Sequence, residues 1–491
     1  MRAFTRILLL LTGAALRASG INATFPGDAS YASASTAFNL RFTLKPAAIT
    51  FPKSAEEVAE VVKIGAAQKV PVVARSGGHS YIANGLGGKD GALVVDLRNL
   101  DSITIDSSSG TAVIETGNRL GDIALALGNA GRALPHGICP YVGIGGHASH
   151  GGFGFTSRMW GLTLDTITAL TTVLANGTLI RVTNSTHPDL FWALRGSASS
   201  FGITTSLEVR TFPSPPTATI FRYDWDLPNA PATARALTSF QSFARTADLP
   251  PHFGALINIA RGPPPSAGPG SVTLSLVGGW YAPVSGLNAT LHPFLREMPE
   301  PQRTTLDTGT YLHSAAVLVG SLDTKSAPDG HDTFYAKSVV TPAGASPIPA
   351  GAVLAFARYL TEEGWASETE WFVQLELYGG KNSAINAVPP DATSFAHRSS
   401  LFTIQFYAAA PGRVPPYPQD GFAFMDDMVK TLTELEHAPA DWQYGAYLNY
   451  IDDRLVDWKE RYYGAHYARL RELKDEYDPR DVFSFPMAVE E

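Results

Sequence analysis

The sequence predicts an α+β fold of two domains, and three observations support this prediction. Its 491 residues exceed the roughly 250 to 300 that a single hydrophobic core usually supports. Helical and strand-like patterns are mixed in the part that ends at residue 212. Strand-like apolar segments separated by glycine and proline then dominate residues 213–440. The run Pro213-Ser-Pro-Pro216 marks the clearest candidate boundary between the two parts.

The first part begins with a helix at 54–69. Ser54-x-x-Glu57 is a capping box, and the residues that follow at helical spacing are Val58, Val61, Val62 and Ala66. Further segments are predicted from their local patterns: strands at 70–74, 92–97 and 111–116, and a helix at 119–130. Residues 171–182 predict a hairpin, because Asn176-Gly177 accepts the positive φ angles of a two-residue type I′ turn.

The second part contains two strands of alternating character. The segment 371–380 places Phe372, Gln374, Glu376 and Tyr378 on one face and Val373, Leu375 and Leu377 on the other. The segment 403–407 repeats the pattern with Thr403, Gln405 and Tyr407. Side by side, these faces would form a polar and aromatic floor. The pattern is equally compatible with the solvated face of an antiparallel sheet. The tail 453–477 is helical, with a break at Gly464 and an end at Asp478-Pro479.

Composition excludes some functions and indicates a compartment. A net charge of −8 provides no basic stripe for nucleic acid or for an anionic membrane. The basic start, short apolar run and small residues of 1–20 are typical of a secretory signal peptide rather than of a membrane anchor. We therefore expect a secreted protein that binds neither nucleic acid nor membranes. Candidate glycosylation sequons follow at Asn22, Asn176, Asn184 and Asn288.

Cys139, the only cysteine, and His79 each lie on a glycine turn. This placement indicates two covalent attachment points for one flat cofactor, although a lone cysteine is often a buried small apolar residue. Gly143-x-Gly145-x-x-Ala148 resembles a dinucleotide fingerprint, but the glycines continue to Gly154, so we expect no amphipathic helix to begin there and point its N-terminus at a pyrophosphate. The spacing of His136, His147 and His150 fits no standard zinc set, and no metal site is predicted.

The motifs together resemble two protein groups. A first set is similar to the berberine-bridge-enzyme-like flavoproteins of the vanillyl-alcohol-oxidase superfamily: Arg75-Ser-Gly-Gly-His79-Ser, the run 137–147, Gly161-Leu-Thr-Leu-Asp165, the run 189–196, and the ending 463–483. A second set resembles the fungal secreted oligosaccharide oxidases: 379–384, Phe395-Ala-His397-Arg398, Gln405-Phe-Tyr407 and 417–425. The resemblance implies a PCMH-type FAD-binding domain from 21–212 plus 441–491, and an antiparallel-sheet substrate domain from 213–440.

The resemblance also implies the cofactor and its attachment. His79 would carry the 8α-methyl link of FAD, and Cys139 would carry the link to ring carbon 6. Other positions that match the cofactor-binding residues of the family are Arg75, Ser76, Gly77, Gly78, Ser80, Val142, Gly143, Gly145, Gly146, His147, Gly152, Ile203 and Asn449. The small side chain of Val142 matches relatives in which oxygen reaches the reduced flavin, which favours an oxidase.

The reaction implied is oxidation of the anomeric hydroxyl at the reducing end of an oligosaccharide to a lactone, with reduction of O2 to H2O2. Tyr450 matches the catalytic base, and Glu376 matches the carboxylate that assists it. From the residue type alone, Tyr450 could equally be a core tyrosine with a satisfied hydroxyl. Residues matching the sugar site are Tyr81, Gln374, Tyr447 and Asn258. We expect a monomer.

The chain departs from its relatives at three places, and two alternative functions remain. Thr24 and Ile64 stand where the relatives have an N-terminal disulfide, His150 stands at a usual glycine, and Tyr141 beside Cys139 is larger than expected. One alternative is a berberine-bridge-like oxidase or dehydrogenase of a secondary-metabolite alcohol or amine. The other is a flavin-carrying carbohydrate-binding protein without turnover.

Overall fold

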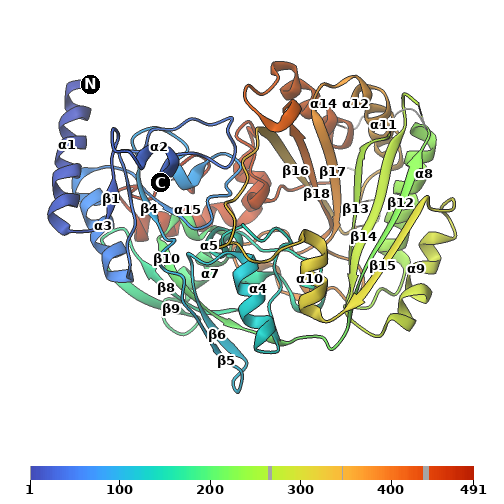
Figure 1. The fold of residues 1–491 in the computed structure, drawn as a ribbon, viewed down its shortest axis with the longest axis horizontal. Coiled ribbons are helices and arrows are strands. Elements are labelled where there is room, and N and C mark those ends of the chain that lie inside the picture. Colours follow the sequence, from blue (N-terminus) through green and yellow to red (C-terminus); the bar gives the residue numbers. More distant parts are fainter. Residues whose placement is uncertain (1, 264–267, 345–346, 435–441, 491) are drawn as a thin grey trace.

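The computed structural model describes residues 2–263, 268–344, 347–434 and 442–490. Within these residues, three larger sheets of four, five and seven strands organise the molecule. Figure 1 shows the four- and five-stranded sheets in one lobe and the seven-stranded sheet in the other. This is the α+β architecture that the sequence predicts.

The four-stranded sheet has the order β1 (Ala23–Thr24), β2 (Ala48–Thr50), β4 (Leu93–Asp96), β3 (Val72–Arg75). Strands β2 and β3 both pair with β4 in parallel, and helix α3 (Ala55–Gln68) forms the crossover connection between β2 and β3. The hydroxyl of Ser54 accepts a hydrogen bond from Glu57 N, which confirms the predicted helix start. Strand β3 ends at Arg75, so the glycine turn 76–78 leaves the edge of this sheet.

The five-stranded sheet is antiparallel and has the order β5 (Ile103–Asp106), β6 (Thr111–Glu115), β10 (Ile203–Arg210), β8 (Ile167–Val173), β9 (Leu179–Thr183). Helix α4 (Leu120–Asn129) follows β6, and helix α7 (Pro188–Ser197) lies between β9 and β10. The predicted strands at 92–97 and 111–116 and the predicted helix at 119–130 are therefore present as β4, β6 and α4, with ends shifted by one residue.

The turn between β8 and β9 differs from the prediction. Leu174 N donates to Thr178 O over 2.9 Å, and Gly177 N donates to Leu174 O over 2.8 Å. Only Gly177 in this turn has a positive φ, of +77°. The connection is thus a three-residue loop ending in a left-handed glycine, and the predicted two-residue type I′ turn is wrong. The Asn176 side chain instead accepts a hydrogen bond from Thr178 N at 2.9 Å, so it needs no left-handed backbone.

The seven-stranded sheet is antiparallel throughout, with the order β15 (Arg303–Gly309), β12 (Ala218–Leu227), β14 (Val272–Trp280), β13 (Phe253–Arg261), β17 (Glu370–Leu377), β18 (Ser400–Ala409), β16 (Phe334–Pro342). One face is covered by helices α8 (Ala230–Thr246), α9 (Leu287–Leu295), α11 (Ala350–Thr361) and α14 (Gln419–Thr433). These helices and the sheet share one apolar core that includes Phe240, Phe356 and Met425. The opposite face of β17 and β18 is therefore available to line a site.

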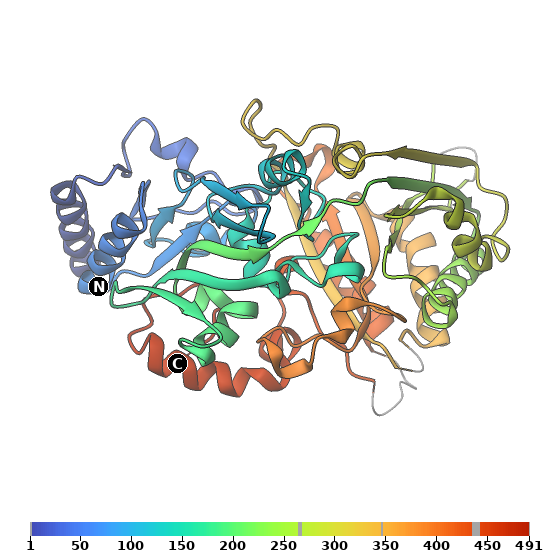
Figure 2. The ribbon, with the colours of Figure 1, turned by 90° about the horizontal axis from the view of Figure 1, so that it is seen from below.

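The chain returns to the first lobe at its C-terminus. A π-helical turn (Lys459–Tyr463) and helix α15 (Tyr467–Tyr477) flank Gly464, whose φ is +51°. This confirms the predicted break, although the helical region begins six residues later than predicted. The buried Lys474 donates to Ser200 O at 2.9 Å and to Asp478 at 2.8 Å. Figure 2 shows α15 running along the lobe that holds the N-terminal elements.

Of the two boundaries of the proposed substrate domain, at 212/213 and at 440/441, only the first lies within the described residues. Residues 213–216 lie between β10 and β12, where the chain passes from the five-stranded to the seven-stranded sheet. The boundary at 440/441 falls outside the described residues. The division of the chain into domains remains a proposal.

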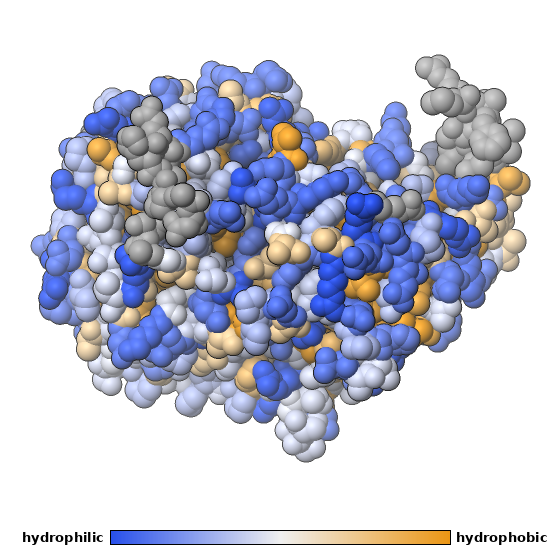
Figure 3. All heavy atoms as spheres, turned by 180° about the vertical axis from the view of Figure 1, so that it is seen from behind, coloured by the Kyte–Doolittle hydropathy of each residue, from blue (hydrophilic) through white to orange (hydrophobic). Residues whose placement is uncertain are grey.

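The N-terminal residues form helix α1 (Arg2–Ser19). Among the described helices, none combines the length and apolar character that crossing a membrane requires. The signal peptide remains a prediction. The face shown in Figure 3 is mostly polar, with apolar residues scattered among polar ones.

Candidate active site

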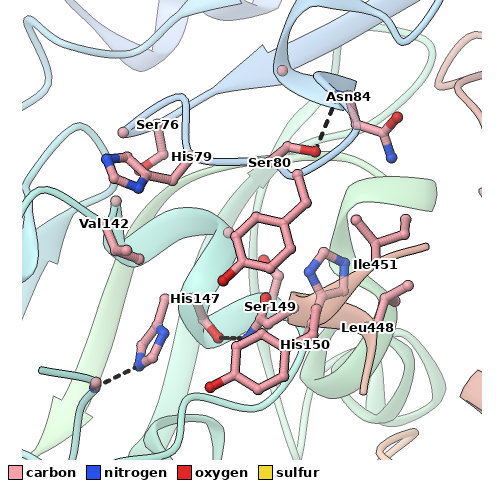
Figure 4. A pocket seen from close by; sticks show the side chains of 18 of the residues that line it. Ser76, His79, Ser80, Asn84, Val142, His147, Ser149, His150, Leu448 and Ile451 are labelled. Atoms are coloured by element: carbon pink, nitrogen blue, oxygen red, sulfur yellow. Dashed lines mark hydrogen bonds between the residues drawn. The ribbon is translucent and has the colours of Figure 1, made fainter. Parts of the chain in front are cut away.

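A cavity of about 620 Å³ lies where the glycine turns meet the open face of the seven-stranded sheet. Its walls come from the turn after β3, from the glycine run 137–154, and from the short turn Leu448–Tyr450. Phe372, Gln374 and Glu376 of β17, with Gln405 and Tyr407 of β18, form the floor. Figure 4 shows His79, Val142, His147 and His150 around this space.

The predicted polar face is confirmed as the floor of this cavity. The register pairs Gln374 with Gln405, Glu376 with Thr403, and Phe372 with Tyr407. The two alternating faces therefore lie side by side as the sequence suggested, and they are enclosed rather than solvated. Tyr378 falls just beyond β17 and is buried against Phe153, with ring centroids 4.1 Å apart.

Almost all of the predicted site residues line this one cavity. Those that do are Arg75, Ser76, Gly77, Gly78, His79, Ser80, Tyr81, Cys139, Val142, Gly143, Gly145, Gly146, His147, Ile203, Gln374, Glu376, Tyr447, Asn449 and Tyr450. Gly152 and Asn258 do not. Gly152 N donates to the Tyr447 hydroxyl at 2.9 Å, so Gly152 supports the wall from behind.

Asn258 lies in an adjoining cavity of about 760 Å³ that shares Phe372 and Gln374 with the first. It is paired with Gln374 across β13 and β17. A ligand that touches Gln374 in the first cavity could therefore extend along the sheet toward Asn258.

Glycine is required where the two turns meet. A Cβ on Gly77 would lie 2.3 Å from Gly143 N, and one on Gly143 would lie 2.0 Å from Gly77 N. Ser76 fastens the contact, because its hydroxyl accepts from Gly145 N at 3.2 Å and donates to Thr116 O at 2.5 Å. A Cβ on Gly146 would meet nothing within 4 Å, which leaves its backbone open to the cavity.

A short helix, α5 (Ile144–Ser149), begins inside the glycine run. Ile144, His147 and Ala148 are buried and Gly146 is exposed, so the expectation that no amphipathic helix starts there is wrong. Glycine in a helix costs only about 1 kcal/mol relative to alanine, and the buried side chains of Ile144 and Ala148 anchor this one. His147 Nε2 accepts a hydrogen bond from Gly137 N at 3.1 Å, which ties the helix to the segment just before Cys139.

His79 and Cys139 both face the cavity from their glycine turns. His79 Nε2 lies 2.6 Å from Oδ2 of Asp329, and its ring stacks on Phe38 with centroids 4.1 Å apart. Cys139 is exposed to the cavity. Partial desolvation raises the pKa of the Cys139 thiol. A hydrogen bond from the backbone N–H of Tyr141 lowers this pKa, and the negative charge of Asp329 raises it further.

Tyr450 and Glu376 form a hydrogen-bonded pair in the cavity wall. The Tyr450 hydroxyl donates to Glu376 Oε1 over 2.6 Å, while Glu376 Oε2 has no partner among the described residues. Burial raises the pKa of Glu376 to about 8. Burial and the neighbouring carboxylate raise the pKa of Tyr450 well above its usual value. At neutral pH the carboxyl is thus the group of this pair that most readily exchanges a proton.

Other aromatic and amide groups hold this pair in place. Tyr81 lies parallel to Tyr450, with centroids 6.0 Å apart and an interplanar angle of 8°. Gln405 Nε2 donates to the Tyr81 hydroxyl at 2.7 Å. The rings of Tyr447 and Tyr450 meet edge-on, with centroids 5.0 Å apart. Asn449 Nδ2 donates a hydrogen bond to the Tyr447 hydroxyl at 2.9 Å. The site is therefore aromatic in its walls and rich in hydrogen-bonding groups.

Some lining residues were not predicted as residues of the site, among them Phe38, His150 and Asp329. The strand alternation predicted Phe372, Gln405 and Tyr407 as part of the floor, without giving them a role. No local signal could have identified Asp329, since it lies 250 residues from His79 in the sequence. His150 fills part of the cavity, and burial lowers its pKa to about 4, so its ring is uncharged at neutral pH.

The donor set of the cavity fits a flat, covalently held flavin. A nucleophilic imidazole and a thiol face one space, and the open backbone of Gly146 lies beside them. Among the described residues, no group of three or more histidine, cysteine, aspartate or glutamate side chains could hold a metal ion.

Comparison with known proteins agrees with this description. Residues 46–183 match the FAD binding domain family, and residues 446–490 match the berberine and berberine like family. The chitooligosaccharide oxidase of Gibberella zeae is 34% identical over 94% of this chain and 91% of its own length. The xylooligosaccharide oxidase of Thermothelomyces thermophilus is 35% identical over 92% and 89%.

Solved structures give the same result. A chitooligosaccharide oxidase superposes with a TM-score of 0.90, at 30% identity over 98% of this chain and 99% of that one. A glucooligosaccharide oxidase from Acremonium strictum, described with a 6-S-cysteinyl, 8α-N1-histidyl FAD, superposes with a TM-score of 0.88, at 31% identity over 98% and 99%. The chain belongs to the family of berberine-like, FAD-binding oxidoreductases that includes the fungal oligosaccharide oxidases.

Proposed function

We propose that this protein oxidises the anomeric hydroxyl at the reducing end of an oligosaccharide to a lactone and reduces O2 to H2O2. The observation that supports this most strongly is the Tyr450–Glu376 pair, which faces a hydroxyl-binding floor in the same cavity as His79 and Cys139. The named oligosaccharide oxidases among the relatives support the substrate class.

FAD would be held by bonds from its 8α-methyl carbon to His79 and from ring carbon 6 to Cys139. When bound, the flavin supplies a hydride acceptor that oxygen can regenerate. The glycine turns at 77–78 and 143–146 would position it through backbone contacts. Gly146 leaves its backbone open to the cavity, since a Cβ there would meet nothing within 4 Å. Two covalent bonds keep the ring in place without a cover, so the opposite side can stay open for a large substrate.

Tyr450 and Glu376 would remove the hydroxyl proton as the C–H hydride leaves. The phenol already donates its hydrogen to the carboxylate, so it can accept the substrate proton while its own proton moves to Glu376. This route avoids a free phenolate beside a carboxylate, which would be unfavourable. Glu376, with its pKa near neutral, is then the final proton acceptor.

Gln374 and Gln405 offer amide groups to sugar hydroxyls, and the neighbouring rings of Phe372 and Tyr407 offer apolar surface. The adjoining cavity near Asn258 leaves space for sugar units beyond the reacting one. Amide groups beside aromatic rings, with space for further sugar units, favour an oligosaccharide as the substrate. A site for an alkaloid-like alcohol or amine would instead be lined mainly by apolar side chains. The intact proton-transfer pair favours an enzyme over a non-catalytic flavin carrier.

The protein would act outside the cell as a monomer. A signal peptide in residues 1–20 and glycosylation at Asn22, Asn176, Asn184 and Asn288 belong to this proposal. All four asparagines are exposed. Size-exclusion chromatography and the mass of the secreted chain test these points.

An oxygen-electrode screen of glucose, cello-, chito- and xylo-oligosaccharides tests the activity. We expect oxygen uptake with at least one oligosaccharide series and release of one H2O2 per sugar oxidised. The Tyr450→Phe variant is the control for contaminating oxidases. Oxygen uptake with none of these sugars, or uptake that is unchanged in the variant, would contradict the proposal.

A further inference from the structure

Asp329 lies against the histidine of the cavity although it belongs to the other lobe. It lies in the segment between α10 (Tyr311–Val319) and β16. Its Oδ2 is 2.6 Å from His79 Nε2, and the two side chains are only 22% and 11% exposed. Asp329 belongs neither to the predicted cofactor-binding residues nor to the proton-transfer pair.

The geometry holds the imidazole from two directions. Phe38 stacks on the ring at an interplanar angle of 23°. The backbone that carries Asp329 is attached to the segment that carries Phe38, because Asp332 N donates to Phe38 O at 3.0 Å and Leu40 N donates to Asp332 O at 2.7 Å. Ring orientation is therefore set by two segments that are hydrogen-bonded to each other.

A third attachment comes from the cysteine side. The hydroxyl of Tyr141 donates to Ala327 O at 3.2 Å. The large side chain that the sequence shows beside Cys139 thus reaches the segment before Asp329. The carboxylate is consequently fixed relative to both His79 and Cys139.

The Asp329 carboxylate also determines which nitrogen of the His79 imidazole keeps an unshared lone pair. A carboxylate can only accept, so the hydrogen of a neutral His79 ring must lie on Nε2. No hydrogen bond among the described residues engages Nδ1. The lone pair of Nδ1 is therefore available to an electrophile in the cavity.

We propose that Asp329 is the positioning residue for covalent flavin attachment to His79: it orients the imidazole, makes Nδ1 the nucleophile and stabilises the ring as it becomes cationic. This inference rests on the flavin of the proposed function but not on its sugar substrate. No role of this kind follows from the motifs, since Asp329 lies in none of them.

The attachment step balances with oxygen as oxidant. One C–H bond of the 8α-methyl group is replaced by a C–N bond to Nδ1, and the methyl hydrogen leaves as a proton. The imidazole gives up its single N–H proton after the bond has formed. The two electrons released pass through the ring system to O2, which takes up the two protons and becomes H2O2.

The same carboxylate has the opposite effect on Cys139. The reactive form of a cysteine is the thiolate, and the negative charge of Asp329 contributes to raising the pKa of the Cys139 thiol. The backbone N–H groups of Tyr141 and Val142 oppose this effect. Removal of the charge should therefore slow one bond and not the other, which a general disturbance of the site would not do.

The test uses Asp329→Asn, which keeps the shape and removes the charge. Secreted holoprotein is digested, and mass spectrometry quantifies flavin on the His79 peptide and on the Cys139 peptide separately. Loss of a hydrogen bond to a charged group predicts a roughly ten- to hundredfold slower histidyl attachment. We expect the cysteinyl bond to remain, so that the flavin still precipitates with the protein in acid.

Three further variants sharpen the comparison. In a Cys139→Ala background, Asp329→Asn should release its flavin on acid precipitation, whereas Cys139→Ala alone should retain it through His79. Asp323→Asn is the matched charge control, because Asp323 lies exposed in the same segment and accepts only from the backbone and side chain of its own turn. It should behave as the unaltered protein.

Full histidyl attachment in Asp329→Asn would overturn the inference. So would equal loss of both bonds, which would show a general collapse of the cavity. Absence of covalent flavin from the unaltered protein would instead contradict the cofactor of the proposed function. Sugar oxidation without these changes in attachment leaves the proposed function in place and rejects the role of Asp329.

Discussion

The phenol oxygen of Tyr450 lies 2.6 Å from Glu376 Oε1, and burial raises the pKa of that carboxyl to about 8. A tyrosine with an unperturbed pKa of about 10 is a poor base at neutral pH. The contact with a carboxylate of near-neutral pKa allows Tyr450 to pass a proton on without becoming a stable phenolate. The chemistry of the cavity depends on this pair.

Replacing Tyr450 with phenylalanine should slow flavin reduction by roughly 10² to 10⁴-fold, the usual contribution of a positioned acid–base group. Anaerobic stopped-flow mixing with an active oligosaccharide measures this rate. Tyr359→Phe is the matched control, since its hydroxyl bonds Phe424 O at 2.9 Å among the helices of the opposite face. A normal rate in Tyr450→Phe would remove Tyr450 from the mechanism.

The rate should depend on pH through Glu376. Below pH 8 the carboxyl increasingly carries a proton and cannot accept another, so kcat/KM should rise about tenfold per pH unit and level off above pH 8. Glu376→Gln should be slow at every pH and lack this rise. A flat profile between pH 6 and 9 in the unaltered protein, or a retained rise in the variant, would be inconsistent with the assignment.

Glu376 should also make stability depend on pH. Its pKa in the folded protein is raised from 4.5 to about 8, so the folded state favours the neutral form. The free energy of unfolding therefore falls as pH rises from about 4.5 to 8 and stays lower above pH 8, by an amount of the order of 5 kcal/mol. Glu376→Gln should match the unaltered protein at pH 4.5 and exceed it at pH 9.

Denaturant unfolding at the two pH values measures this difference. Tyr450 can still donate to the amide oxygen of the variant, so the hydrogen bond is conserved. If the two proteins were equally stable at pH 9, the ionised Glu376 carboxylate would not destabilise the folded state, which would contradict this prediction.

The sequence predicted the parts of this site that depend on local patterns. Alternation along 371–380 and 403–407 indicated two polar faces, and β17 and β18 place them side by side. The capping box at Ser54 predicted the start of α3. Both signals come from residues close together in the chain.

The features that the sequence did not predict depend on contacts between residues far apart in the chain or on small differences in free energy between local conformations. The Asp329–His79 contact joins two lobes, so no local periodicity reports it. Helix α5 forms in a glycine run because Ile144 and Ala148 are buried by other elements. At the β8–β9 turn, Asn-Gly is compatible with more than one loop, and the strand register selects the longer one.

Substitution of Gln374 by alanine should weaken sugar binding with little effect on proton transfer. Loss of a neutral hydrogen bond predicts a rise in KM of roughly two- to tenfold with kcat nearly unchanged. Gln419→Ala, at the exposed start of α14 on the opposite face of the sheet, is the control. Unchanged KM across the oligosaccharide series would show that Gln374 does not contact the sugar.

The ion pair between Arg398 and Asp165 should be important for stability. It joins two segments 233 residues apart with hydrogen bonds of 2.9 and 2.7 Å, and the side chains are 1% and 8% exposed. Asp165→Asn leaves a buried guanidinium without its counter-ion, which typically costs about 3 to 5 kcal/mol.

Denaturant unfolding of the holoprotein measures this cost. Asp189→Asn removes an exposed ion pair with Arg469 and should change stability by less than about 1 kcal/mol. Comparable losses in both variants would mean that burial does not distinguish the two ion pairs.

Anaerobic titration of the yellow holoprotein with a reducing oligosaccharide tests the central claim most directly. We expect bleaching of the flavin absorbance by one equivalent of sugar, formation of the corresponding lactone or aldonic acid, and full recovery of the colour with one H2O2 when oxygen is admitted. A flavin that no oligosaccharide bleaches, while it remains reducible by dithionite, would contradict the assignment of this cavity to sugar oxidation.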